Sequence, residues 1–190
     1  MEQKPFESCA VTGHRPTRFA FRYDESDPRC AALKQQLRCQ LIRLCRRGVR
    51  RFWVGGALGV DLWVTEALLA LRAEGCYAPE ICLAVPFEGY DAGWSEADRQ
   101  RMAAVRLACQ QVAVVTDGAD PAEDFKVRNR YMVDRADCLL AVWDSDRRRS
   151  GTGMTVHYAE RLGLPVLVIH PDTLKVRYLL PEQRGKLTEF

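Results

Sequence analysis

Six short runs along the chain are apolar almost throughout, instead of alternating between apolar and polar residues. This pattern is typical of strands buried on both faces of a parallel sheet, because helices cover both of their faces. The runs that predict strands are residues 7–12, 51–54, 80–86, 111–116, 138–143 and 165–169.

The longer segments between these runs carry apolar residues at three- and four-residue spacing, which predicts amphipathic helices. In the first of them, Leu33, Leu37 and Leu41 fall on one face, and Gly48 follows as a helix terminator. Ser95 precedes another segment in a capping-box pattern, with an acidic residue three positions later. The predicted helices are residues 28–47, 60–74, 95–108, 122–136 and 152–162.

Strands and helices that alternate in this way predict an α/β fold, a Rossmann-like, doubly wound, mainly parallel sheet with helices on both faces. We expect a single domain over residues 1–190, with its core at about residues 7–170. The polar tail, residues 171–190, is expected to pack loosely.

The composition fits a soluble globular protein, with 47% hydrophobic and 28% charged residues. The first residues lack the apolar segment of a signal peptide. No apolar run approaches the roughly 18 residues that a membrane span needs. We therefore expect a cytoplasmic protein with no membrane partner.

The eight cysteines include no pair in a CxxC spacing, which argues against a metal site. Cys9, Cys82 and Cys138 lie inside apolar runs, where thiols behave as small hydrophobic groups. We interpret the cysteines as structural thiols and predict no bound metal.

The net charge of +3 indicates no particular partner, but the basic residues form two clusters. The first runs from Arg43 to Arg51 at a predicted helix end, where cations complement the helix dipole. The second comprises residues 147–149 beside Ser150, where arginines are suited to phosphate.

The end of the first strand is a candidate site, because ligands of open α/β sheets bind at the carboxyl ends of the strands. Thr12 offers a hydroxyl, Gly13 allows a tight turn, and Arg15 offers a guanidinium to phosphate or carboxylate. His14 adjoins the turn. The alternative is an ordinary turn with an exposed arginine.

The second strand ends in a loop that contains Gly55, Gly56 and Gly59 and leads into a predicted helix. Such a loop can direct backbone N–H groups at an anion, although it is neither GxGxxG nor a Walker motif. Asp61 follows, either as a ligand for a ribose hydroxyl or as a stabiliser of the helix N-terminus.

The fifth strand ends at Asp144, and a loop with Ser150, Gly151 and Thr152 then opens a helix that includes Thr155. Its hydroxyls and amides suit phosphate, although an N-cap would have the same residues.

Arg128 and Asn129 lie early in a predicted helix, where they either face the cleft or point into solvent. His157 and His170 are interpreted as structural residues, and the sequence contains no Ser–His–Asp order, HExxH motif or paired carboxylates.

Taken together, these motifs resemble the YpsA-like group of the SLOG superfamily, over nearly the whole chain from Cys9 to His170. The matching segments are AVTGHRP at 10–16, GGALGVD at 55–61, WSEADR at 94–99, RNRYMVD at 128–134, AVWD at 141–144 and SGT at 150–152. The resemblance implies a Rossmann-like fold, a nucleotide-derived ligand and a homodimer.

Two better-known branches of the superfamily suggest alternative functions. Lonely Guy phosphoribohydrolases place a catalytic glutamate three residues after the threonine of the glycine-rich loop, a position that Thr155 occupies here. DprA proteins load a recombinase onto single-stranded DNA, but this chain shows no continuous basic stripe in its sequence.

Three hypotheses follow. The first is binding of a nucleotide or ADP-ribose-like phosphorylated ligand at the strand ends, as a sensor. The second is an enzyme that cleaves an N-glycosidic bond of nucleoside monophosphates, with Asp61, Asp144 or Glu88 as candidate acids. The third is DprA-like binding of single-stranded nucleic acid.

Overall fold

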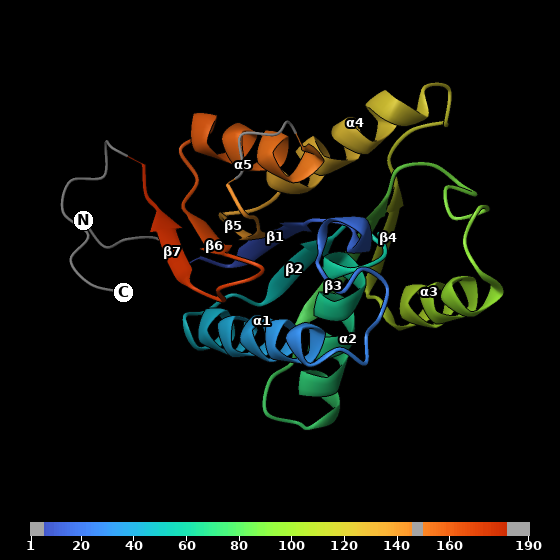
Figure 1. Cartoon of the computed structure of the whole chain (residues 1–190). Coiled ribbons are helices and arrows are strands. Elements are labelled where there is room, and N and C mark those ends of the chain that lie inside the picture. Colours follow the sequence, from blue (N-terminus) through green and yellow to red (C-terminus); the bar gives the residue numbers. More distant parts are fainter. Residues whose placement is uncertain (1–5, 146–149, 182–190) are drawn as a thin grey trace.

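The centre of the molecule is a seven-stranded sheet (Figure 1). The computed structural model describes residues 6–145 and 150–181. In chain order the elements are β1 (Ser8–Gly13), the 3-10 turn η1 (Pro16–Arg18), α1 (Pro28–Arg46), β2 (Arg51–Val54), α2 (Val60–Ala73), β3 (Glu80–Val85), α3 (Glu96–Ala108), β4 (Gln111–Val114), α4 (Pro121–Val133), β5 (Cys138–Val142), α5 (Gly151–Arg161), β6 (Val166–Ile169) and β7 (Val176–Leu179).

The strand order is β4-β3-β2-β1-β5-β6-β7, and all neighbours pair in parallel except β6 and β7. The strand β1 lies in the middle, with Cys9 opposite Phe52 on one side and Cys138 on the other. The predicted Rossmann-like, doubly wound fold is confirmed.

Helices cover both faces of the sheet (Figure 1). Leucines of α1 and α2, with Met102 and Val105 of α3, form one core against one face. Met132 and Val133 of α4 join Val156 of α5 in a second core against the opposite face. Successive residues of the central strands point into alternate cores, which explains why these strands are apolar throughout.

Ser95 caps a helix as predicted, and Asp27, which was not predicted as a cap, does so as well. The Oγ of Ser95 accepts a hydrogen bond from the backbone N–H of Asp98 at the start of α3. Asp27 caps α1 in the same way, and Pro28 follows it at the first helical position. These caps set the residues at which α1 and α3 begin.

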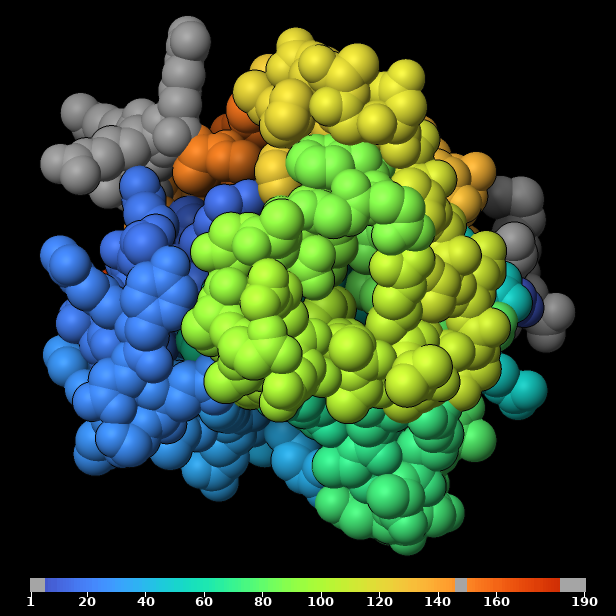
Figure 2. Space-filling view, turned by 90° about the vertical axis from the view of Figure 1, so that its right-hand side faces the viewer, coloured from blue at the N-terminus to red at the C-terminus, as the bar shows by residue number. Residues whose placement is uncertain are grey.

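The two edges of the sheet differ from the sequence prediction. Residues 171–190 were expected to pack loosely, but β7 lies in this segment and pairs antiparallel with β6. At the other edge, β4 was expected to be buried on both faces, yet Val112 and Val114 are 37% and 43% exposed. Among the described strands, β4 pairs with β3 alone; Figure 2 shows this side of the molecule, with α3 at its surface.

All eight cysteines are free thiols, and Cys9, Cys82 and Cys138 are buried, as predicted for structural thiols. In the described ranges, no group of three or more His, Cys, Asp or Glu is arranged to hold a metal ion. No helix in the same ranges has the length and apolar character that a membrane crossing requires.

Candidate functional site

The polar strand ends meet where the strand order reverses, between β1 and β5. The helices that follow these two strands, α1 and α5, lie on opposite faces of the sheet, so a crevice opens at the carboxyl ends. A cavity of about 230 Å³ occupies this position and is called the switch-point cavity below. Its lining residues are Thr12, Gly13, His14, Arg15, Thr17, Arg18, Ala57, Asp61, Arg128, Asn129, Ser150, Gly151 and Thr152.

The loop after β1 is joined to the end of β5 by contacts from His14 and Arg18 to Asp144. His14 is buried, and its Nε2 lies 3.1 Å from Oδ1 of Asp144. The other carboxylate oxygen of Asp144 accepts a hydrogen bond of 2.9 Å from Arg18. Asp144 therefore holds both His14 and Arg18 at the cavity, although Asp144 itself is not among the lining residues.

A buried ion pair lies on another wall of the cavity. An Nη1 of Arg128 is 3.7 Å from Oδ2 of Asp61, and the same oxygen accepts a hydrogen bond from the backbone N–H of Ala57. Burial raises the pKa of Asp61 and lowers that of Arg128, and in each case the partner's charge opposes the shift. Within residues 6–145 and 150–181, Nε of Arg128 has no hydrogen-bond partner.

The glycines after β2 shape the cavity without lining it. Arg128 donates a hydrogen bond to the carbonyl of Gly55, and a Cβ at Gly55 would overlap the guanidinium. Gly59 has a φ of +91°, which only glycine adopts easily, and lies against Pro16. Gly56 accepts a hydrogen bond from Tyr90 through its carbonyl. Gly55 thus allows the close approach of Arg128, and Gly59 that of the β1 loop.

The first turn of α5 provides the opposite wall. Ser150 is the N-cap, and its Oγ accepts a hydrogen bond from the N–H of Gly153. The N–H groups of Gly151 and Thr152 belong to the first turn, which has no acceptors within the helix. The loop is thus both the N-cap expected as one alternative and a source of amides at the cavity.

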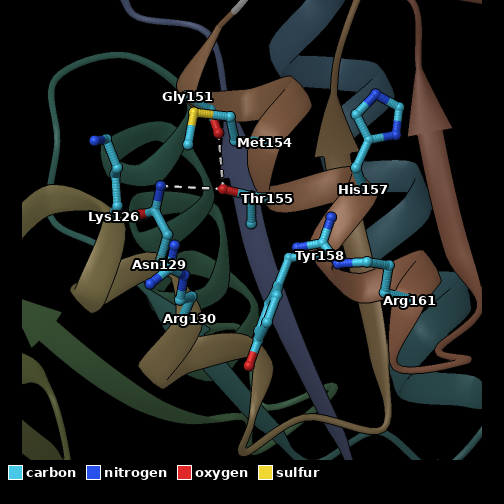
Figure 3. Close-up of a pocket in the computed structure, with 9 residues that line it drawn as sticks. All are labelled: Lys126, Asn129, Arg130, Gly151, Met154, Thr155, His157, Tyr158 and Arg161. Atoms are coloured by element: carbon cyan, nitrogen blue, oxygen red, sulfur yellow. Dashed lines mark hydrogen bonds between the residues drawn. The ribbon is translucent and has the colours of Figure 1, made fainter. Parts of the chain in front are cut away.

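A hydrogen-bonded bridge joins α4 to α5 beside the cavity. Asn129 donates from Nδ2 to Oγ1 of Thr155 at 3.0 Å, and Thr155 donates to the carbonyl of Gly151 at 2.9 Å. Beyond this bridge lies a second hollow of about 180 Å³, the α4–α5 groove (Figure 3). Its lining residues are Lys126, Asn129, Arg130, Gly151, Met154, Thr155, His157, Tyr158 and Arg161.

The structure brings most of the predicted site residues to these two hollows. Of the three candidate acids, Asp61 lines the cavity and Asp144 adjoins it, whereas Glu88 lies elsewhere and pairs with Arg106. His170 accepts hydrogen bonds within its own turn, and His157 pairs with Glu160. The arginines at 147–149 lie outside the described residues.

Sequence reasoning missed Thr17, Arg18 and Ala57, which also line the cavity. The spacing of Arg15 and Arg18 is the one available signal, since η1 places residues three apart on one side. The ring of Phe125 was missed as well, and the guanidinium of Arg15 lies 4.9 Å from its centre.

The fold and the position of the cavity define a Rossmann-like protein with its candidate site at the switch point. A family model described as the YspA SLOG family, under the name YpsA, matches residues 9–174. The chain belongs to this family, as its motifs suggested. It is also 30% identical over 142 residues to UPF0398 proteins of Bacillus thuringiensis (strain Al Hakam) and Bacillus cereus (strain AH187), a match that covers 73% of this chain and 74% of each relative.

Two solved structures share the fold. DprA of Streptococcus pneumoniae matches with a TM-score of 0.60 at 17% identity, over 87% of this chain and 50% of DprA. DprA of Helicobacter pylori, described by its single-stranded DNA binding mode, matches with a TM-score of 0.58 at 20% identity, over 85% of this chain and 64% of that protein. This chain therefore spans half to two thirds of the length of these proteins.

Proposed function

We propose that this protein binds a phosphorylated, nucleotide-type ligand in the switch-point cavity. The observation that carries the proposal is the convergence of three strand-end loops on one cavity, which joins cationic side chains to the first turn of a helix. Each loop alone has an ordinary structural explanation. Their meeting at the switch point supports a binding site, because that is where open α/β sheets place ligands.

The phosphate is assigned to the side of the cavity formed by Arg15, Arg18 and the first turn of α5. Arginine offers two parallel N–H donors to a phosphate, and helix N-termini attract anions through their unpaired amides and dipole. Arg15 is exposed at the mouth, so it can reach a ligand without first losing a buried partner.

The sugar is assigned to the side of Asp61. This carboxylate would repel a phosphate, but its oxygens can accept hydrogen bonds from hydroxyl groups. Its neighbour Arg128 is buried and has an Nε without a partner in the described part of the chain. A ligand acceptor at that Nε would remove the cost of burying an unsatisfied donor.

Thermal unfolding with a panel of AMP, ADP and ADP-ribose at millimolar concentration tests the proposal. A ligand that binds only the folded chain stabilises it by RT ln(1 + [L]/Kd), or about 2.7 kcal/mol at 100 times Kd. We expect Arg15→Gln to weaken binding by about tenfold or more, because it removes a charge-assisted hydrogen bond.

Arg22→Gln is the matched control, because Arg22 is an exposed arginine of the same loop that does not line the cavity. No stabilisation by any phosphorylated nucleoside would overturn the proposal. Equal losses in the Arg15 and Arg22 variants would show only a general charge effect.

A second candidate function is binding of single-stranded nucleic acid. The specific observation in its favour is the fold shared with DprA, one of whose structures is described by its single-stranded DNA binding mode. Fluorescence anisotropy of a labelled oligonucleotide at about 50 and 200 mM salt would test it, since phosphate contacts make affinity fall steeply with salt. Binding that is absent at both salt concentrations would exclude this candidate.

The homodimer implied by the family resemblance stays a prediction. Analytical ultracentrifugation of the full chain, with and without AMP, would decide it.

A further inference from the structure

The α4–α5 groove has the chemistry of an anion site. Figure 3 shows Lys126 and Arg130 reaching into it from α4, with Arg161 on the α5 side. Among the described residues that line it, none is Asp or Glu. Tyr158 forms a wall, and the guanidinium groups of Arg130 and Arg161 lie 6.0 and 5.6 Å from the centre of its ring.

The acidic partner of Lys126 and Arg130 lies outside the lining and holds them weakly. Glu123 is 2.8 Å from Lys126 and 3.7 Å from Arg130. All three side chains are more than 40% exposed, and exposed ion pairs contribute little to stability. The cations can therefore turn toward a phosphate at small cost.

The groove and the switch-point cavity are neighbours that share two lining residues, Asn129 and Gly151. The wall between them is the bridge from Asn129 to Thr155 and on to the carbonyl of Gly151 (Figure 3). This wall is polar and presents the carboxamide of Asn129 to a ligand that passes over it.

The sizes of the two hollows indicate that they act together. At about 230 and 180 Å³, each is smaller than the roughly 300–1,000 Å³ of small-molecule sites, whereas their combined volume falls within that range. A mononucleotide in the switch-point cavity would leave the cations of the groove unused.

We propose that the α4–α5 groove is a second anion subsite for the same ligand, which then carries two nucleotide-like halves joined through phosphate. This inference rests on the proposed function. A pyrophosphate-linked molecule such as ADP-ribose and a phosphodiester-linked dinucleotide share this chemistry. The first phosphate lies beside Arg15 and α5, and the anionic part of the second half lies between Arg130 and Arg161.

Isothermal titration calorimetry with three probes tests the subsite: AMP, ADP-ribose and the dinucleotide pTpT. We expect at least one of the two longer probes to bind about tenfold tighter than AMP, as one added charge-assisted contact would provide. Arg161→Gln should remove this advantage and leave the affinity for AMP unchanged. Met154→Glu should do the same by placing a carboxylate in the groove at an exposed position.

Arg177→Gln is the charge-matched control, because Arg177 is exposed on β7 and lines neither hollow. Two results would overturn the subsite. In the first, the groove variants bind the longer probes as tightly as the unaltered chain does. In the second, the unaltered chain binds AMP as tightly as both longer probes. If AMP binding persists in that case and depends on Arg15, the proposed function survives alone. If no probe binds the unaltered chain, both proposals fail. Whichever of ADP-ribose and pTpT binds more tightly identifies whether the ligand is linked through pyrophosphate or through a phosphodiester.

Discussion

Two clusters of this molecule each pair a carboxylate with an arginine, but their hydrogen-bonding groups are satisfied to different degrees. Glu25, in the loop between β1 and α1, accepts hydrogen bonds from Arg101, Lys34 and the indole of Trp63. Asp61, at the switch-point cavity, faces Arg128 at 3.7 Å, beyond hydrogen-bonding distance. The Glu25 cluster is half-buried and saturated, whereas the Asp61 pair is fully buried and incompletely bonded.

The difference distinguishes a cluster that ties a loop to three helices from a pair that borders the candidate site. Burial alone would raise the pKa of Glu25, but the hydrogen bonds from Arg101, Lys34 and Trp63 outweigh it and lower the pKa to about 2. This cluster ties the loop that carries His14, Arg15 and Arg18 to α1, α2 and α3. At the cavity, by contrast, the buried Nε of Arg128 has no hydrogen-bond partner among the described residues, which is costly unless a ligand supplies an acceptor.

The largest effect is expected from Arg128→Leu. It leaves Asp61 buried without a counter-charge, so the free energy of unfolding should fall by about 3–5 kcal/mol in urea titrations. The double variant with Asp61→Asn should recover much of this loss, because no charge then remains buried. A single-variant loss below about 1 kcal/mol, typical of exposed pairs, would remove the contrast between the two clusters.

A smaller effect is expected from Gly55→Ala, whose Cβ would meet both Arg128 and Asp61. Overpacking of this kind costs about 1–3 kcal/mol, and it should also weaken nucleotide binding by displacing the pair. Gly93→Ala is the control, since a Cβ at Gly93 would meet no atom within 4 Å and Gly93 lines neither hollow. Thermal unfolding and the ligand panel check both variants, and equal stability of the two would contradict the close packing of the pair.

The smallest effect is expected from Glu25→Gln, about 1 kcal/mol at neutral pH, because the cluster is partly exposed and its hydrogen bonds are exchanged for water. The pKa of Glu25 is depressed, so its stabilisation is complete above the ordinary value of 4.5 and is lost as the pH falls toward about 2. The difference in unfolding free energy between the unaltered chain and the variant should therefore shrink over this window. A difference independent of pH would show that the Glu25 charge is not what holds the loop.

Much of the fold could be predicted because its signals are local. Apolar runs marked six of the seven strands, and Ser95 marked the start of α3. The short strand β7 escaped prediction because its half-exposed residues give neither a buried nor a clearly alternating pattern. The convergence of the strand-end loops could be expected, since parallel strands present their carboxyl ends at one edge.

The pairings between distant side chains could not be predicted. Glu25 and Arg101 are 76 residues apart, and Arg128 lies 73 residues from the Gly55 carbonyl it contacts. The spacing of residues along the sequence carries no information about such pairings. In the sequence, each of these charged residues looks like an ordinary surface residue. The sequence therefore identified the loops of the candidate site, but not which charges in them are buried together.

The central position of β1 in the sheet has a consequence for folding during synthesis on the ribosome. Ser8 donates its backbone N–H to Asp137, which lies 129 residues later, and β1 pairs along its length with β5. One side of β1, the first of the seven strands described along the chain, thus remains unpaired until β5 has been synthesised, and until then it presents unpaired N–H and C=O groups. Such edges invite pairing with other chains. The interval between the synthesis of β1 and that of β5 is therefore one in which the chain is prone to aggregation and in which a chaperone would help it.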